Sequence, residues 1–197
     1  IIDDGSIDDT SIIIKEFLHD TRFKLITQKN GGLSAARNVG IQTSSGTILA
    51  FLDSDDLYHK DYLSSIAKFH KTYPEVNQAS FSRLMYIDHE GRLLYPYSFG
   101  YPYKLTFESF IDCPLLPVAV SLKKESLNGD ILFDEEYTIA EDYELWTRLA
   151  ELGMVFSPLA NTLVFYRYRP SSMMFEGMHR YNENFSKIQH QLLKKID

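Results

Sequence analysis

The most constraining feature of this sequence is a continuous apolar run, TILAFLD at 47–53, that leads directly into the acidic cluster DSDD at 53–56. Continuous apolar runs of this length are typical of strands that are buried on both faces, as in a parallel sheet. The acidic cluster would then stand at the carboxyl end of that strand. We therefore expect a buried strand that presents three carboxylates, those of Asp53, Asp55 and Asp56, where it ends.

The first seventy residues alternate short apolar runs with stretches of helical pattern. Strands are predicted to end at Asp3 and to cover 23–28 and 47–53, and helices to run from Thr10 or Ser11 to about His19, over 33–42 and over 60–73. This order implies right-handed crossovers and an open α/β sheet. Ligands of such sheets bind at the carboxyl ends of the strands. Two acidic clusters, DDGS and DSDD, are therefore expected to face one crevice.

The second half of the chain is less regular. We expect a hairpin at 79–97 that turns at DHEG, a short helix at 106–112, a helix at 140–153, a strand at 162–169 and a helical tail from Tyr181. No internal repeat or linker is evident, so we predict one domain over residues 1–197. Because the opening IIDDGS resembles the end of a strand, we expect that domain to be truncated at its N-terminus.

The composition narrows the class of protein. The chain is 44% hydrophobic and 24% charged, as in soluble globular proteins. Its net charge of −7 argues against a nucleic-acid partner, which usually requires a basic face. No apolar run approaches the ~20 residues that span a bilayer. The single cysteine, Cys113, allows neither an intrachain disulfide nor a cysteine metal cluster, which fits a reducing compartment.

Asp53 and Asp55 form a D-x-D pattern at the predicted strand end. Hard cations such as Mg²⁺ and Mn²⁺ take oxygen ligands, and they commonly bind through one or two carboxylates and substrate phosphates. Aspartates are also common in polar turns. The pattern is therefore compatible with a metal site, but on its own it is a weak signal.

Two other stretches carry charged residues that leave alternatives open. Glu141 and Asp142 begin a predicted helix, where carboxylates are favoured by the helix dipole whether or not they do chemistry. The stretch NGGLSAARNVG matches neither the dinucleotide-binding nor the P-loop pattern. Arg37 within it can face an anion or pair with a surface carboxylate.

Taken together, these stretches resemble the family 2 glycosyltransferases, which are inverting enzymes with the GT-A fold. That fold is Rossmann-like, with a mostly parallel central sheet flanked by helices and a small antiparallel hairpin. The resemblance reaches from the first residue to about Met173, and the family's usual opening strand is missing from it. It rests on the ordered set IIDDGSIDDT, NGGLSAARNVGI, GTILAFLDSDDLYHKDYL, FDEEYTIAEDYELWTRLAELG and YRYRPSSM.

The resemblance implies a nucleotide-sugar donor, and a UDP-sugar above all. Asp4 would hydrogen-bond the uracil with Asp3 beside it, and Arg37 would approach the nucleotide. The D-x-D pair, Asp53 and Asp55, would also belong to the donor site.

The resemblance also implies a cofactor and a catalytic base. Mn²⁺ or Mg²⁺ would be held by Asp55 as the direct ligand and by Asp53, whereas Asp56 would only organise the loop. Asp142 would be the general base, with Glu141 supporting it or the acceptor.

The acceptor implied is a saccharide or a lipid-linked hydroxyl, and the pathway is cell-surface polysaccharide synthesis. Such an enzyme would act in the cytoplasm or peripherally at the inner face of the membrane.

Two departures from the family stand out. Arg169 occupies a place where relatives often carry histidine, and NGDILFDEE replaces a Gly-Gly-Phe run.

Two other functions remain open from the sequence. One is a module that binds a nucleotide-sugar without transferring it. The other is a haloacid-dehalogenase-type phosphatase, which also uses D-x-D after an apolar strand. That class places the motif on its first strand, however, whereas here it follows at least the third predicted strand.

Overall fold

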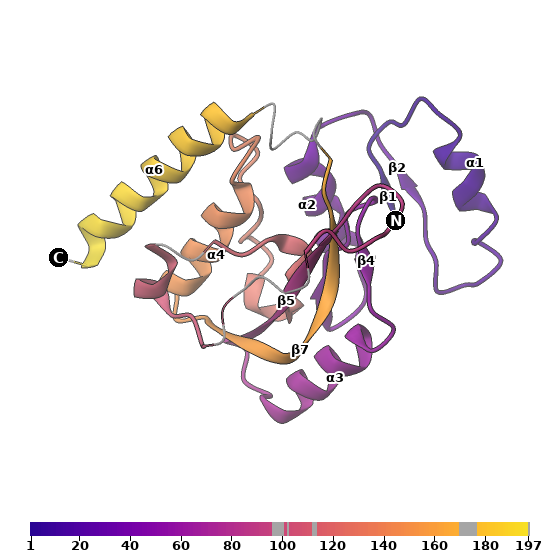
Figure 1. Ribbon diagram of the computed structural model, residues 1–197. Coiled ribbons are helices and arrows are strands. Elements are labelled where there is room, and N and C mark those ends of the chain that lie inside the picture. The colour runs from indigo at the N-terminus through magenta and orange to yellow at the C-terminus, as the bar shows by residue number, and fades with distance from the viewer. Residues whose placement is uncertain (96–100, 102, 112–113, 170–176, 197) are drawn as a thin grey trace.

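The computed structural model describes residues 1–95, 101, 103–111, 114–169 and 177–196 (Figure 1). Cys113 and residues 170–173 of the last family stretch lie outside the described residues. The strands are β1 (Ile2–Asp3), β2 (Ile26–Thr27), β3 (Ile48–Ala50), β4 (Leu57–Tyr58), β5 (Gln78–Ile87), β6 (Val120–Lys123) and β7 (Val155–Arg167). The helices are α1 (Thr10–Lys15), α2 (Leu33–Thr43), α3 (Tyr62–Thr72), α4 (Glu141–Glu151) and α6 (Met178–Ile196), with 3₁₀ turns η1 (Phe107–Ile111), η2 (Pro117–Ala119) and η3 (Lys124–Leu127).

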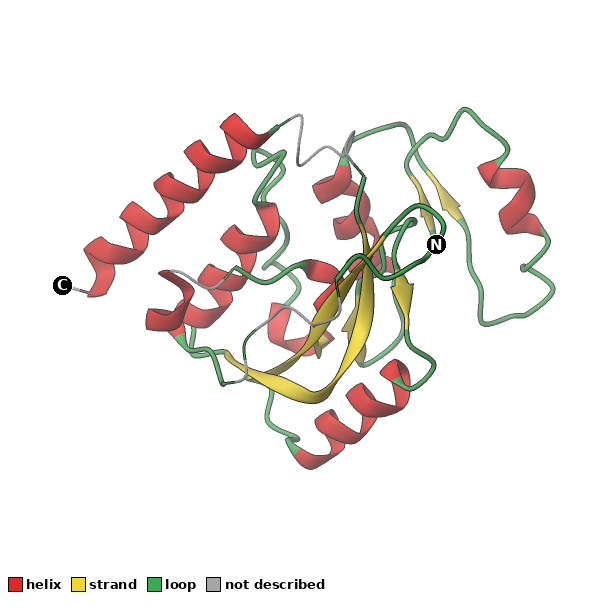
Figure 2. Ribbon diagram, viewed as in Figure 1, coloured by secondary structure: helices red, strands yellow, loops and turns green. Residues whose placement is uncertain are grey.

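The strands form two sheets, and the larger one is mixed (Figure 2). Its order is β3-β6-β5-β7-β4, and β5 pairs in parallel with β7 along nearly its whole length. The pairs β3–β6, β5–β6 and β4–β7 are antiparallel, and β1 and β2 form a separate parallel pair. The sheet is thus less parallel than we expected. The reason is that the short strands β4 and β6 were not predicted, and both pair antiparallel.

The apolar run before the acidic cluster forms a shorter and more exposed strand than expected. β3 covers three residues, of which Leu49 is buried and Ala50 is exposed. Among the described strands it pairs only with β6, so it lies at an edge of the sheet and is not buried on both faces. The acidic cluster at 53–56 follows this strand after two further residues, Phe51 and Leu52, rather than directly.

Apolar side chains pack on both faces of the larger sheet. On one face Trp146 is fully buried, within 6.0 Å of the ring centroids of Phe133 and Phe156, and its Nε1 donates to the Leu115 carbonyl at 2.9 Å. This layer includes residues of α4 and α6, whereas α3 belongs to a second cluster on the other face. Figure 1 shows α3 on one side of the sheet and α4 and α6 on the other.

The predicted helices are confirmed with small shifts at their ends. In α4 the stripe of Leu145, Trp146 and Leu149 is buried as predicted, but Leu152 lies past the helix end and is 66% exposed. α1 ends at Lys15, earlier than predicted, and none of its side chains is buried. Within the described chain, no helix combines the length and the apolar character that crossing a membrane requires.

Candidate active site

α2 presents a polar face to the segment that precedes α4. Ser34, Arg37 and Asn38 are three and four positions apart, so they share one side of the helix, and all three are buried. Ser34 Oγ donates to the Tyr137 carbonyl at 3.2 Å. Asn38 Nδ2 donates to the Phe133 carbonyl, and the Phe133 N–H donates back to Asn38 Oδ1, both at 2.9 Å. The SAARN stretch of α2 therefore holds the backbone of the segment that leads into α4.

Arg37 joins the D-x-D stretch to the acidic pair of α4. Its Nη1 donates to Glu141 Oε1 at 2.6 Å, and its Nη2 donates to the Asp53 carboxylate at 3.0 and 3.1 Å. The side chains of Arg37 and Glu141 are each only 8% exposed. The guanidinium Cζ also lies 5.4 Å from the ring centroid of Phe133. The sequence left open whether Arg37 faces an anion or pairs with a surface carboxylate. The structure shows that it pairs with two carboxylates, of which that of Glu141 is buried.

The carboxylates around Arg37 stabilise the positively charged form of its side chain. Burial by itself would lower the pKa of Arg37, but the charges of Asp53, Glu141 and Asp142 outweigh this effect and raise it. The guanidinium in turn reduces the repulsion among these acidic groups. Asp53, Glu141 and Asp142, which are far apart in sequence, are therefore brought together around one cation.

Asp142 has the surroundings of a proton acceptor. It lies in the first turn of α4, after Ala140 in the left-handed region at φ 64°. Its Oδ1 accepts a hydrogen bond from the Tyr143 N–H at 2.7 Å. Displacement of water by the surrounding protein raises the pKa of Asp142 to about 7; the charge of Glu141 adds to the rise and Arg37 opposes it. A carboxyl that titrates near neutrality is well matched to general base catalysis.

Asp4 holds the beginning of α2. Its Oδ1 accepts hydrogen bonds from Gln28 Nε2 at 2.7 Å and from the Gly31 N–H at 2.9 Å, and its Oδ2 accepts one from the Gly32 N–H at 2.8 Å. Burial by itself would raise the pKa of Asp4, but these hydrogen bonds outweigh it and lower the pKa. A carboxylate at the beginning of a helix is also favoured by the helix dipole.

Asp3 is buried, and its Oδ1 accepts a hydrogen bond from the Ser6 N–H at 2.8 Å. Hydrogen bonding by the side chain of Ser6, and then by its backbone N–H, lowers the pKa of Asp3. Among the described residues, no hydrogen bond or ion pair joins Asp3 or Asp4 to Asp53. α2 connects the two acidic clusters instead, because it begins beside Asp4 and carries Arg37.

Asp53 and Asp55, the expected metal ligands, follow β3 with side chains that are 32% and 33% exposed. Among the described residues, no group of three or more His, Cys, Asp or Glu side chains converges to hold a metal ion. Two accessible carboxylates still fit a hard divalent cation, because phosphate oxygens and water can supply the other ligands. Asp55 Oδ2 lies 3.4 Å from Nε of the exposed Arg169, so this arginine does reach the D-x-D stretch.

Arg167 is a residue of this site that sequence reasoning missed. It ends β7, where its backbone N–H donates to Asp56 Oδ1 and its Nε donates to the Asp55 carbonyl, both at 2.7 Å. Asp56 is buried, and burial raises its pKa to about 7. The run YRYR was visible in the sequence, but the family resemblance drew attention to Arg169, and no local pattern indicated a role for Arg167.

Tyr181 was also missed as a neighbour of the expected base. Burial raises its pKa to about 12, and the charge of Asp142 contributes to that rise. Its ring stacks on Phe185, with the centroids 5.7 Å apart. The sequence predicted only a helical tail here, and no local pattern indicated that α6 would approach the first turn of α4.

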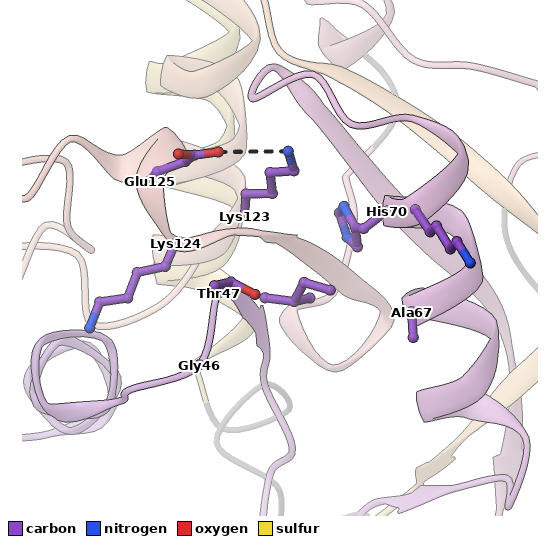
Figure 3. A pocket seen from close by; sticks show the side chains of 9 residues that line it. Gly46, Thr47, Ala67, His70, Lys123, Lys124 and Glu125 are labelled. Atoms are coloured by element: carbon purple, nitrogen blue, oxygen red, sulfur yellow. Dashed lines mark ion pairs between the residues drawn. The ribbon is translucent and has the colours of Figure 1, made fainter.

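A cavity of about 660 Å³ lies at the other end of β3 and is separate from these residues (Figure 3). Its lining consists of Gly46, Thr47, Ile48, Ala67, His70, Lys71, Lys123, Lys124 and Glu125. Lys123 and Glu125 form an ion pair of 3.6 Å at its edge. None of the site residues expected from the sequence lines this cavity.

Comparison with known proteins identifies relatives of the chain. Residues 1–120 match the family model described as glycosyl transferase family 2. An uncharacterised glycosyltransferase of Rickettsia bellii (strain RML369-C) is 32% identical over 191 residues, which cover 95% of this chain and 27% of that protein. The chondroitin synthase of Escherichia coli is 30% identical over 156 residues, which cover 78% of this chain and 22% of that protein. The chain thus spans about a quarter of the length of two Rickettsia relatives and of the chondroitin synthase.

Solved structures resemble the chain over most of its length. S. aureus TarS 1-349 in complex with UDP-GlcNAc superposes with a TM-score of 0.70 at 25% identity, covering 88% of this chain and 50% of that one. The same protein in complex with UDP also gives a TM-score of 0.70, at 22% identity, with 95% of this chain and 54% of that one covered. The likeness shows a shared fold.

Proposed function

Because this chain belongs to glycosyl transferase family 2, we propose that it transfers a hexose from a UDP-sugar to an acceptor hydroxyl with inversion at the anomeric carbon. The GT-A fold expected from the family resemblance is confirmed by the superposition on TarS. The observation that carries the proposal is the contact of Arg37 with both Asp53 and Glu141, because it brings the D-x-D stretch beside Asp142.

The proposed donor site lies along α2 and the end of β3. Asp4 stands beside the beginning of α2 and would accept a hydrogen bond from the uracil, with Asp3 supporting its loop. Arg37 would contribute its positive charge toward the nucleotide from the same helix. A UDP-sugar is favoured because TarS, a relative in fold, was solved with UDP and with UDP-GlcNAc.

The proposed chemistry is a single displacement. The acceptor oxygen forms a bond to the anomeric carbon while the bond from that carbon to the diphosphate oxygen breaks, and the electron pair leaves with UDP. Asp142 removes the proton of the attacking hydroxyl, and Glu141 supports the acceptor side of the site. A general base of this kind contributes ~10²–10⁴-fold to the rate. A separate protein acid, which glycoside hydrolases need for their leaving alcohol, is not required here.

Asp55 would be the direct ligand of Mn²⁺ or Mg²⁺, with Asp53 as the second carboxylate. Bound there, the cation would stabilise the negative charge of the departing diphosphate. Both carboxylate oxygens of Asp53 already accept hydrogen bonds from Arg37, which supports Asp55 as the more available metal ligand.

The acceptor we propose is a saccharide or lipid-linked hydroxyl of a cell-surface polysaccharide. The names of two relatives, a chondroitin synthase and a minor teichoic acid biosynthesis protein, support this class. We place the reaction in the cytoplasm, at the inner face of the membrane. A haloacid-dehalogenase-type phosphatase is not supported, because the match to glycosyl transferase family 2 covers the D-x-D stretch itself.

A donor screen on the intact protein tests the proposal. UDP-, GDP- and dTDP-sugars are titrated by calorimetry with Mn²⁺ and with chelator, and the products are analysed for the anomeric configuration. We expect Mn²⁺-dependent binding of a UDP-sugar and transfer with inversion, and we expect Asp55→Ala to weaken both. Preference for a GDP-sugar would contradict the uracil role of Asp4. Binding of UDP-sugars without transfer or donor hydrolysis would favour the binding module instead.

A further inference from the structure

Asp56 lies directly after the D-x-D pair, yet its contacts differ from those of an exposed turn residue. Its side chain is buried, with the residue 5% exposed. Oδ1 accepts the Arg167 N–H at 2.7 Å, whereas Oδ2 is buried and has no hydrogen-bond partner within the part of the chain that the structure describes. The Asp56 N–H donates to the Asp53 carbonyl at 3.1 Å, which closes the turn that holds Asp55. A buried carboxylate that keeps an oxygen unpaired is costly, so this position needs an explanation beyond turn formation.

Arg167 connects this turn to a second one. Its Nε donates to the Asp55 carbonyl at 2.7 Å, and its Nη1 donates to the carbonyls of Asp88 and His89 at 2.6 and 2.9 Å. The second turn is itself closed by Asp88 Oδ1, which accepts the backbone N–H of Arg92 at 2.9 Å. One arginine thus ties the D-x-D turn to the turn after β5, and its own backbone is held by Asp56.

The neighbouring Arg169 provides a contrast. It is exposed, and among the described residues its ion-pair partner is the Asp55 carboxylate, with Nε 3.4 Å from Oδ2. Arg167 instead donates to backbone carbonyls, those of Asp55, Asp88 and His89. The two arginines of the YRYR run therefore act on different parts of Asp55: one on its backbone, the other on its side chain.

We propose that Asp56 and Arg167 are positioning residues, which hold the D-x-D turn against the turn after β5 so that Asp55 presents its carboxylate to the cation on the donor diphosphate. This inference rests on the proposed function, because it concerns the same cation. Groups that orient a metal ligand typically change metal affinity by ~10–100-fold when they are lost. Lysine cannot replace Arg167, because a single ammonium does not reproduce the planar fork that donates to separate carbonyls.

The test compares four single variants of the intact protein, together with the double variant Arg167→Lys/Asp56→Ala. Arg167→Lys keeps the charge but loses the fork, and its control is Arg83→Lys, because Arg83 donates to one β7 carbonyl, that of Ala160, at 3.3 Å. Asp56→Ala removes the acceptor, and its control is Asp61→Ala, because Asp61 is exposed and makes no side-chain cap hydrogen bond at the start of α3. UDP is titrated by calorimetry with Mn²⁺ and with chelator, and amide exchange is followed at 53–57 and 88–92.

We expect Arg167→Lys and Asp56→Ala to weaken Mn²⁺-dependent UDP binding by about 10–100-fold and to speed exchange in both turns, while binding in chelator stays unchanged. The controls should match the wild type. The two effects should not add in the double variant, because both residues act on one turn.

Other outcomes would overturn this inference. Variants that fold, as judged by their melting temperatures, and bind Mn²⁺ and UDP like their controls would show that the pair does not position Asp55. Failure of both variants to fold would make the pair a determinant of folding only. If the wild type itself shows no Mn²⁺-dependent UDP binding, the proposed function is wrong, and the positioning role proposed for Asp56 and Arg167 is then wrong too.

Discussion

Asp142 combines two opposing influences at the residue scale. The beginning of α4 favours a negative charge there, yet the surrounding protein and the charge of Glu141 raise its pKa to about 7. Arg37 opposes that rise from the other side. The carboxyl therefore changes its protonation state in the range where a general base is most effective.

Replacing Asp142 by asparagine should remove the proton acceptor and leave the donor site intact. We expect Asp142→Asn to lower kcat by ~10²–10⁴-fold with UDP affinity unchanged, as measured by steady-state kinetics and calorimetry. Glu144→Gln is the matched control, because Glu144 lies in the same helical turn but pairs with Arg148 at 2.7 Å. Full transfer activity in Asp142→Asn would refute the assignment of the base.

The pH dependence of transfer should report the raised pKa of Asp142. A general base acts only when it is ionised, so kcat/KM should rise with pH up to about 7 and level off above it, rather than being flat above the ordinary aspartate pKa of 3.8. In Glu141→Gln the acidic limb should move to lower pH, because the charge of Glu141 raises the pKa of Asp142. A limb that stays in place in this variant would argue against Asp142 as the titrating group.

At the scale of elements, α2 organises the site. Its beginning is held by Asp4, and its polar face holds the segment before α4 through Ser34 and Asn38. Through Arg37 it also reaches the turn after β3. One helix thus positions groups from three separate parts of the chain, and the central link is a buried ion pair.

Breaking that ion pair should destabilise the protein. Arg37→Met leaves Glu141 buried at 8% side-chain exposure without its partner, so we expect the free energy of unfolding to fall by ~3–5 kcal/mol. Adding Glu141→Gln removes the uncompensated charge and should recover part of that loss. Urea unfolding of the wild type, both single variants and the double variant measures the coupling. A loss in the double variant equal to the sum of the two single losses would show that the pair itself contributes nothing.

At the scale of the whole molecule, packing is uneven. β5 lies between β6 and β7 at the centre of the larger sheet and contributes to the apolar layers on both of its faces. α1 has no buried side chain and lies with β1 and β2 at the side of the molecule remote from α6 (Figure 1). Local stability should therefore differ strongly along the chain.

Hydrogen exchange of the intact protein should follow this difference. Backbone amides of α1 should exchange fastest among the helices, and those of β5 and β7 slowest among the strands, because opening the central pair requires disruption of both apolar layers. Exchange measured by mass spectrometry at neutral pH checks the order. Protection of α1 equal to that of β5 would contradict it.

Much of the fold could be predicted because its signals are local. Helical periodicity located α2, α3 and α4 to within a few residues, and the apolar run before DSDD located β3. Motif order along the chain pointed to the family that the comparison confirmed. The roles assigned to Asp4, Asp55 and Asp142 stay predictions, but Asp4 and Asp55 do follow the strands β1 and β3, and Asp142 does lie in the first turn of α4.

By itself, then, the sequence determined the family, the main helices and the positions of the acidic motifs, because these depend on residue types within a few turns or strands. Only the tertiary structure decided that β4 and β6 make the sheet mixed, that Arg37 pairs with Glu141 across 104 positions, and that Asp56 holds Arg167 across 111. Strand partners and buried ion pairs form between segments that are distant in sequence. Which of several similar charges meet is settled only when the whole chain packs, and no local pattern records that choice.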